Sequence, residues 1–422
     1  MKRNQFRSAL LLLLAAALLL AMIGCSVQGS QPAVKENATP SAASDAATDN
    51  TTETKPAAEA EAPTTASSAE EGQLGSNGLI QHPQGKLKIA YLLDSLTNDS
   101  SQRHWQQVQN ECSMRDWELI YDNNVSGNYE ADATRQAFQN MMAQEPDAIV
   151  ISYLDIPPIA DLCVEAHNKG IGVYCIGTDI SDGIMMNVCS NNSVIGAKVM
   201  AYVMDRLGGE ANMIGFQNLW MTRGIRRDEI AMSMANSKTY NVATTEVHEV
   251  TPEGFLDEMF SVTENWLTKY GSDIDFLWAC WDGGGIVMAQ AMAAQGYTAD
   301  DMFTVGMDGG SQAWAYIRNG DIPFVASLAE PFEYQVHQCF EGIYQMQVEG
   351  MRRGEPGCIV PTSGEYSTDN MTVMVDKNNC PEVGSNVHAI FNYYGGDADD
   401  ADAWYNQGEI YTVKDYTGEE AQ

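Results

Sequence analysis

Polar and aromatic side chains directly follow several apolar runs of the sequence. Those that could contact a ligand at these places are Asp94, Asn98, Asp179, Arg226, Trp281 and Asp308. Carboxylates and amides exchange hydrogen bonds with vicinal hydroxyls, and a flat aromatic ring covers the apolar face of a sugar. Each Asp could instead cap the helix that follows it, which is a common role. Because the set recurs at the same end of the apolar runs, we expect one site for a small ligand there.

The sequence contains no constellation typical of an enzyme. It lacks HExxH and GxSxG motifs, and its six histidines show no spacing typical of metal ligands. Residues 283–285 are all Gly but lack the Lys-Ser/Thr that completes a phosphate-binding loop, so they predict a tight turn between a strand and a helix. Asp179 and Asp308 could pair as acid and base, or could accept hydrogen bonds from hydroxyls. We therefore expect a binding protein without a cofactor or a metal.

Apolar runs alternate with segments of helical composition from residue 87 onward. The expected strands are 87–93, 117–121, 148–152, 173–176, 212–216, 242–250, 276–280 and 304–307. The expected helices are 101–116, 132–144, 159–169, 193–207, 226–237, 255–270 and 286–295. This alternation predicts parallel, doubly wound α/β sheets, and there are too many units for one sheet, so two lobes are expected. In such sheets ligands bind beyond the carboxyl ends of the strands, where the polar side chains lie.

The N-terminal segment determines the expected compartment. Residues 1–24 combine a basic start with 15 uncharged residues, 9–23, too few for a membrane span of about 20, and predict a signal peptide. Cys25 directly follows Gly24, as in the bacterial lipobox, where the Cys thiol is lipidated and becomes the mature N-terminus. An ordinary signal peptide or an uncleaved anchor is the alternative. Residues 25–85 are rich in Ala, Thr, Ser, Glu and Pro, which predicts a disordered tether outside the cytoplasm.

Charge and cysteine content restrict the partners and the covalent framework. The 422 residues include 23 Lys and Arg against 57 Asp and Glu, a net charge of −34, of which −31 belongs to residues 85–422. Nucleic acid and an anionic membrane surface are disfavoured, because both require clustered cations. Most of the eight cysteines after Cys25 are expected to be small buried hydrophobes, and Cys358 with Cys380 is the one candidate disulfide.

Residues 86 to about 377 resemble the type I periplasmic binding proteins, specifically the ribose- and galactose-type sugar-binding proteins of ABC transporters. The resemblance is carried by the ordered series Leu87–Asn98, Asp147–Asp179, Ser190–Asn192 with Gly196, Phe276–Met288, Val305–Gly309 and Gly320–Pro323. It implies two doubly wound, parallel-sheet α/β lobes joined by a three-stranded hinge. The crossings would lie near Ser190, Glu330-Pro331 and Val360-Pro361.

The same resemblance implies domain boundaries. The N-terminal lobe would comprise 86–189 plus 330–359, and the C-terminal lobe 190–329 plus 360–380. Residues 381–422 would form an acidic C-terminal extension, for which a solvated surface is the expectation.

The resemblance also implies roles for single residues. Asn98 and Asp179 fall where the family hydrogen-bonds sugar hydroxyls, and Arg226 where an Arg reaches the ring oxygen or hydroxyls. Phe255 matches an aromatic that covers one sugar face, and Asp308 the Asp of a Gly-Phe-Asp-Gly segment.

The sequence departs from the ribose type where that type has a stacking pair of Phe. This chain has Asp99-Ser100-Ser101 after Asn98, so we expect stacking from Trp281, with Trp105 or Trp220 as substitutes. Asp94, Asn98 and Asp99 together would suit a more hydroxylated, aminated or cationic ligand.

We expect a monomeric, extracytoplasmic solute-binding protein anchored to the membrane through a lipid on Cys25. It would capture a small polyhydroxylated ligand, with a monosaccharide as the leading candidate, and deliver it to an ABC transporter permease. The alternatives are a sensory subunit for a chemoreceptor or kinase, and a nucleoside or autoinducer receptor of the same fold.

Overall fold

A computed structural model describes residues 70–122, 131–252, 254–391 and 400–416. The expected signal peptide, the lipidation site Cys25 and the tether up to residue 69 lie outside the described residues. No helix in these four described ranges combines the length and the apolar character needed to cross a membrane.

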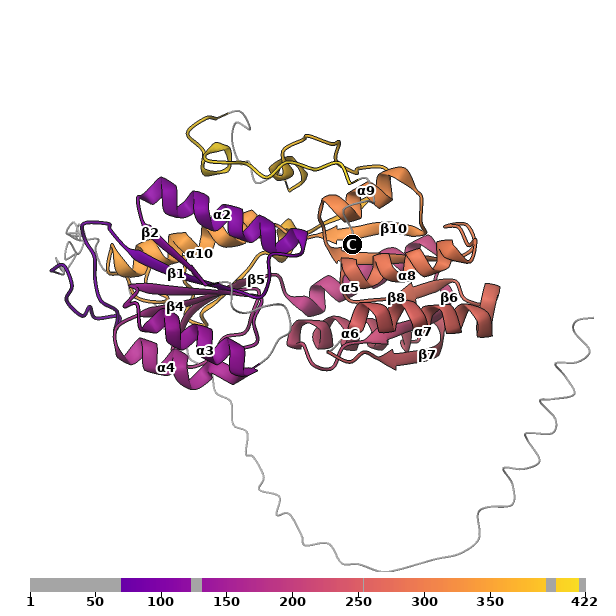
Figure 1. Ribbon diagram of the computed structural model, residues 1–422, viewed down its shortest axis with the longest axis horizontal. Helices are drawn as coiled ribbons and strands as arrows, with labels where there is room; N and C mark the ends of the chain where they lie inside the picture. Colours follow the sequence, from indigo (N-terminus) through magenta and orange to yellow (C-terminus); the bar gives the residue numbers. More distant parts are fainter. Residues whose placement is uncertain (1–69, 123–130, 253, 392–399, 417–422) are drawn as a thin grey trace, which may run out of the picture. The chain divides into compact units, whose positions relative to one another are not determined.

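The first lobe is built on a six-stranded parallel sheet with the strand order β11-β5-β4-β3-β1-β2 (Figure 1). Its elements are β1 (Lys88–Leu93), α2 (Asp99–Arg115), β2 (Glu118–Asp122), α3 (Ala131–Met142), β3 (Ala148–Ser152), η1 (Pro157–Ile159), α4 (Ala160–Asn168), β4 (Gly172–Ile176), β5 (Ile184–Cys189), α10 (Phe332–Gln347) and β11 (Glu365–Ser367). Alternate residues of β1 serve opposite faces: Ile89 and Tyr91 pack with α2 and α10, whereas Ala90 and Leu92 pack with α3 and α4. Helices on both faces explain the continuous apolar runs, because no strand face is left for solvent.

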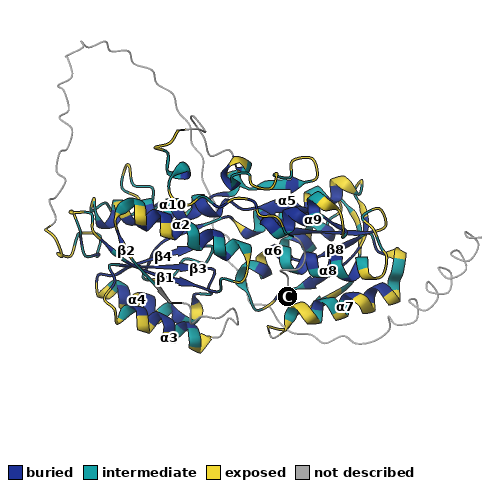
Figure 2. Cartoon of the chain, turned by 45° about the horizontal axis from the view of Figure 1, so that its top comes forward, coloured by how far each residue is buried: buried dark blue, intermediate teal, exposed yellow. Residues whose placement is uncertain are grey.

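The second lobe repeats this plan on a six-stranded sheet with the order β12-β10-β9-β8-β6-β7. Its elements are α5 (Asn192–Arg206), β6 (Glu210–Gln217), α6 (Thr222–Ala235), β7 (Asn241–Glu249), α7 (Phe255–Tyr270), η2 (Gly271–Asp273), β8 (Phe276–Trp278), α8 (Asp282–Ala294), β9 (Phe303–Asp308), α9 (Ser311–Asn319), β10 (Phe324–Ala329) and β12 (Val373–Asp376). The central strands of both sheets are buried, whereas residues of the edge strand β7 are exposed or half-buried, and the helices turn their exposed residues outward (Figure 2). The predicted two-lobed fold is confirmed, except that β12 pairs with β10 in the antiparallel sense.

The glycine run after β8 does not form the predicted turn. Helix α8 begins at Asp282, so the three glycines lie in its first turns. A Cβ on Gly285 would lie 2.8 Å from the Val305 carbonyl oxygen. The glycines therefore allow the start of the helix to approach the neighbouring strand closely, which positions Asp282 at the strand ends.

Three segments connect the lobes, and the predicted position of one of them is wrong. The first two are Ser190-Asn191 after β5 and Glu330-Pro331 after β10, as expected. The crossing expected near Val360 is wrong, because β11 pairs in parallel with β5 of the first sheet. The chain leaves the first lobe only after β11, through η3 (Asp369–Met371), so residues 360–367 belong to the first lobe.

Polar side chains join the three crossings. The amide nitrogen of Gln335 donates to Ser190 Oγ at 3.1 Å and to Thr368 Oγ1 at 3.0 Å. These hydroxyls are themselves 3.0 Å apart, and both residues are buried.

The predicted tether ends earlier than residue 85. Leu79 is fully buried in the core of the first lobe. The amide of Asn77 donates to the carbonyl oxygens of Met346 and Met351, and Ile80 N donates to Gly170 O at 2.9 Å. The tether prediction is therefore wrong for residues 70–85, because this segment packs on the first lobe and forms hydrogen bonds with it.

The C-terminal extension is only partly the solvated surface that its composition predicts. Asp400 and Asp402 are exposed, but Tyr405, Tyr411 and Val413 are buried. Two short helical turns, η4 (Val387–Ile390) and η5 (Trp404–Asn406), also lie in this segment. The extension is thus packed against the folded lobes.

The candidate disulfide is not formed. Cys358 packs against the core of the first lobe, whereas the thiol of Cys380 donates to Trp314 O in the second. All eight cysteines in the described ranges are free thiols. The pair was chosen from loop composition, which does not report which lobe each loop joins.

Candidate functional site

A cleft of about 540 Å³ lies between the two lobes at the carboxyl ends of the strands. This volume falls within the roughly 300–1,000 Å³ of small-molecule sites. The first lobe contributes Asp94, Thr97, Asn98, Asp99, Ser100, Gln102 and Tyr153 to its lining. The second lobe contributes chiefly Trp220, Arg223, Arg227, Phe255, Trp281, Asp282, Ile286, Asp308 and Gln312.

Asp94 and Asn98 form part of the first-lobe wall, as predicted. Asp94 is buried, and its Oδ1 accepts from Ser95 N at 2.7 Å and from Ser101 Oγ at 2.9 Å. Asn98 caps α2 through its side-chain oxygen, which accepts from Ser101 N at 2.8 Å. Capping therefore occupies the oxygen of Asn98 and leaves its amide nitrogen as the group that can donate to a ligand.

The second-lobe wall carries a cluster of three aromatic rings. The ring centroid of Phe255 lies 5.7 Å from that of Trp281 and 5.9 Å from that of Trp220. Trp281 and Phe255 thus occupy the places predicted for them, and Trp220 joins them. Trp105 does not, since it stacks on Tyr91 in the first lobe at 5.7 Å.

A buried arginine, Arg227, connects the strand ends of the second lobe to the hinge. Its guanidinium donates to Asp308 Oδ1 at 3.1 Å, Glu330 Oε1 at 2.6 Å, the Cys280 carbonyl at 2.9 Å and Asn192 Oδ1 at 2.9 Å. Burial alone would lower the pKa of Arg227, but the carboxylates of Glu330 and Asp308 raise it, so the residue is charged.

The backbone of Asp308 is strained at the cleft. Its φ of 109° lies in the region that favours glycine. Burial raises the pKa of the Asp308 carboxyl, and the charge of Arg227 opposes that rise. The hydrogen-bonding network around Asp308 stabilises both its strained backbone and its half-buried carboxyl, a pattern found at functional sites.

Asp282 is a second half-buried carboxyl beside Asp308. It accepts from Gly309 N at 2.8 Å and from Ser327 Oγ at 2.6 Å. Burial, followed by the repulsion of Asp308, raises the pKa of Asp282 well above its usual range. Because Asp308 has Arg227 as its counter-ion, the pKa of Asp282 is the more strongly raised of this pair.

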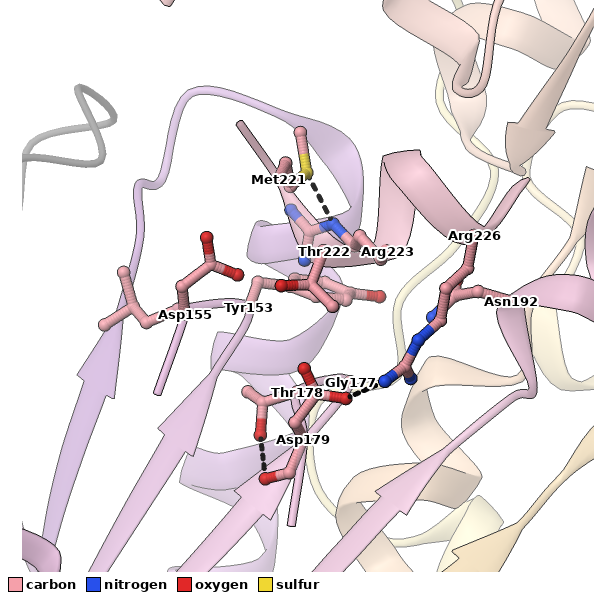
Figure 3. A pocket seen from close by; sticks show the side chains of 11 residues that line it. Tyr153, Asp155, Gly177, Thr178, Asp179, Asn192, Met221, Thr222, Arg223 and Arg226 are labelled. Atoms are coloured by element: carbon pink, nitrogen blue, oxygen red, sulfur yellow. Dashed lines mark hydrogen bonds and ion pairs between the residues drawn. The ribbon is translucent and has the colours of Figure 1, made fainter. Parts of the chain in front are cut away.

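Asp179 and Arg226 are brought together by the structure, but away from the large cleft. Arg226 reaches across the lobe interface to Asp179 Oδ1 at 2.9 Å (Figure 3). Both line a neighbouring pocket of about 10 Å³, which has room for about one water molecule. In this conformation they hold the lobes together, and ligand binding by this pair stays a prediction.

Tyr153 and Arg223 link the small pocket to the cleft, since they line both. The Arg223 guanidinium lies 4.2 Å from the centre of the Tyr153 ring, which joins the second lobe to the first. The Tyr153 hydroxyl is buried and has no hydrogen-bond partner within the described part of the chain. A buried hydroxyl at the cleft wall is a ready partner for a ligand or for water.

The sequence did not predict Arg223, Arg227 or the role of Asp282. A motif match selected Arg226, whereas a residue four positions after Arg223 shares its helix face. The spacing of Arg223 and Arg227 on α6 was thus the signal that could have identified the cleft pair.

No cluster of His, Cys, Asp and Glu within residues 70–122, 131–252, 254–391 and 400–416 has the arrangement of a metal site.

Comparison with known proteins agrees with this geometry. The family model described as "periplasmic binding protein domain" matches residues 89–346. A xylitol-binding protein of Mycolicibacterium smegmatis is 23% identical over 210 residues, which span 48% of this chain and 57% of that protein.

Solved structures share the fold. A solute-binding protein of an ABC transporter from Agrobacterium vitis with bound allitol superposes with a TM-score of 0.59 at 19% identity, covering 69% of this chain and 96% of that chain. A periplasmic solute-binding protein from Actinobacillus succinogenes with bound D-allose gives a TM-score of 0.60 at 19% identity, covering 69% and 98%.

The family model covers well over half of the sequence, and its members bind solutes and do not catalyse reactions. The chain therefore belongs to the periplasmic binding protein family, as its sequence predicted, and its two α/β lobes enclose the cleft described above.

Proposed function

We propose that this protein captures a small polyhydroxylated molecule, a monosaccharide or a sugar alcohol, in the interlobe cleft and delivers it to an ABC transporter permease. The observation that carries the proposal is the composition of a single 540 Å³ cleft. Its aromatic cluster (Trp220, Phe255 and Trp281) suits the C–H face of a sugar, and carboxyls and amides from both lobes suit its hydroxyls.

Closure of the lobes follows from the same contacts. A ligand that bonds to Asp94 of the first lobe and Asp308 of the second interacts fully only when the lobes are together. The ligand therefore raises the ratio of closed to open molecules, by at most the factor by which it binds the closed state more tightly. A permease could then distinguish loaded from empty protein by the relative position of the lobes.

The ligands named for similar proteins support the chemical class. They are xylitol for a relative in sequence, and allitol and D-allose for two structural neighbours. All three are small, uncharged and rich in hydroxyls. The two neighbours belong to ABC transporters, which supports delivery to a permease.

Attachment to the membrane through a lipid on Cys25 is part of the proposal and rests on the sequence before that residue. Metabolic labelling with a fatty-acid probe should mark the wild-type protein and not Cys25→Ala. Labelling of neither protein would contradict the anchor without affecting the ligand proposal.

A thermal-shift panel tests the ligand. The panel contains xylitol, allitol, D-allose, L-arabinose, adenosine and a cationic amino sugar. A sugar or sugar alcohol at about 100 times its Kd should stabilise the protein by about 2.7 kcal/mol and raise its Tm. Trp281→Ala should lose the shift, whereas Trp105→Ala, outside the cleft, should keep it.

Two outcomes would overturn the ligand proposal. One is a shift with adenosine or the amino sugar alone, and the other is no shift with any member of the panel.

A further inference from the structure

The C-terminal segment 400–416, here called the C-terminal strap, contacts both lobes. It runs over α2 and α10 of the first lobe and reaches α9 of the second (yellow in Figure 1). It is separate from the three hinge crossings, which lie at 190–191, 330–331 and 368–372.

Contacts with the first lobe fix the middle of the strap. The ring of Trp404 stacks on His337 of α10 with centroids 4.2 Å apart. Glu409 O accepts from the amides of Gln106 at 2.8 Å and Asn110 at 3.0 Å, and Glu409 N donates back to Asn110 Oδ1 at 3.1 Å. Gln106 and Asn110 are four residues apart on α2, so one face of that helix holds the strap.

The residues that come next in the strap contact the second lobe. Tyr411 and Val413 are buried in the second-lobe core, at 4% and 1% exposure. The backbone of Lys414 donates to Ser311 Oγ at the start of α9 at 2.9 Å. The chain therefore passes from one lobe to the other between Glu409 and Tyr411.

This passage brings the strap to the ligand cleft. Lys414 and Tyr416 are among the residues that line it. The ammonium of Lys414 lies 3.2 Å from Gln102 Oε1, and the Tyr411 hydroxyl donates to Asp99 Oδ1 at 2.9 Å. Asp99 Oδ2 accepts from Gln312 N of the second lobe at 3.0 Å, so the strap reinforces a bond between the lobes.

We propose that the C-terminal strap is a third component of the ligand site, which holds the lobes together and supplies Lys414 and Tyr416 as specificity-determining residues of the cleft wall. Lys414 adds a third cationic donor to a cleft that Arg223 and Arg227 line together with several carboxyls, and Tyr416 adds an aromatic surface. The assignment of the cleft to a ligand rests on the proposed function, whereas the holding of the lobes does not.

Hydrogen exchange of the full chain without ligand tests the holding role. The Gln312 amide is the reporter, because its bond to Asp99 joins the lobes. In the double variant Gln106→Ala/Asn110→Ala, whose sites lie outside the cleft, this amide should exchange about three to ten times faster. The matched control is Gln136→Ala/Asn140→Ala, which removes a similar amide pair from the exposed face of α3. Its Gln312 exchange should equal that of the wild type.

Calorimetry with xylitol, or with the best ligand of the panel, tests the cleft wall. Lys414→Met should weaken binding about three- to tenfold, whereas Thr412→Ala, an exposed site in the same strap, should not. Unchanged Gln312 exchange in the double variant would overturn the holding role, and unchanged affinity in Lys414→Met would overturn the specificity role. Faster exchange supports the strap even if the wild type binds none of the panel, in which case the proposed function alone fails.

Discussion

Replacing Arg227 with Met should destabilise the protein far more than the same replacement of its neighbour Arg226. Arg227 and its partner Glu330 have side chains only 4% and 5% exposed, and Asp308 is 26% exposed. Met fills the space of the arginine stem but removes every donor. Glu330 then remains buried, and Asp308 half-buried, without their counter-ion.

The magnitude follows from burial. Removing one partner of a buried ion pair costs about 3–5 kcal/mol, because the other charge stays desolvated. At about 2–4 °C per kcal/mol, the Tm should fall by roughly 6–20 °C. Arg226 is 47% exposed and pairs with Asp179 at the surface, so its loss should cost only about 0–1 kcal/mol.

Differential scanning calorimetry of both variants at about pH 5 and about pH 8 is the assay. Burial raises the pKa of Asp308 and of Glu330, and Arg227 opposes this rise. Without Arg227 both carboxyls titrate at higher pH, so the folded state binds more protons than the unfolded state, and stability falls as pH rises. The loss of stability caused by Arg227→Met should therefore be larger at the higher pH. Equal melting temperatures for the two variants would refute the reasoning.

Three further predictions follow from local geometry. Burial raises the pKa of Asp228 to about 7, above its value in the unfolded chain. This group therefore favours folding at low pH and loses that contribution as the pH rises toward 7. The destabilisation caused by Asp228→Asn should shrink over the same pH range in calorimetric melts. Gly285→Ala should cost about 1–3 kcal/mol in urea unfolding, because its Cβ would meet the Val305 carbonyl at 2.8 Å, and unchanged stability would refute this contact. A reducing agent should leave the Tm unchanged, since Cys358 and Cys380 lie in different lobe cores, and a fall would indicate a disulfide.

The sequence was most informative about the sheets. Continuous apolar runs such as 148–152 are fully buried strands with helices on both faces, and their ends locate the cleft. Strand β10 was missed because Ala326 and Ser327 interrupt its apolar pattern, although both are buried. Whether a strand residue is buried depends on neighbouring strands and helices that are distant in sequence, so local composition does not predict it.

The wall of the cleft was predicted in outline, whereas ligand binding by Asp179 and Arg226, which line the neighbouring small pocket, stays a prediction. Asp94, Asn98, Phe255, Trp281 and Asp308 all line the cleft, since each lies at a strand end or helix start on that edge.

Arg226 and Arg227 have different surroundings because adjacent helix residues point about 100° apart. Arg227 reaches Glu330 and Asp308, whereas Arg226 reaches Asp179.

The strap could not be predicted either. Its role depends on contacts with residues 102–110, about 300 positions earlier in the chain.

The central claim is that a small polyol binds between the aromatic cluster and the strand-end carboxyls of the interlobe cleft. A crystal structure of the protein with the best ligand of the panel tests it most directly. The account predicts electron density for the ligand in the cleft, with hydroxyls within hydrogen-bond distance of Asp94 and Asp308 and a carbon face against Trp281. Density for the ligand outside the cleft, with the cleft filled only by water, would contradict it.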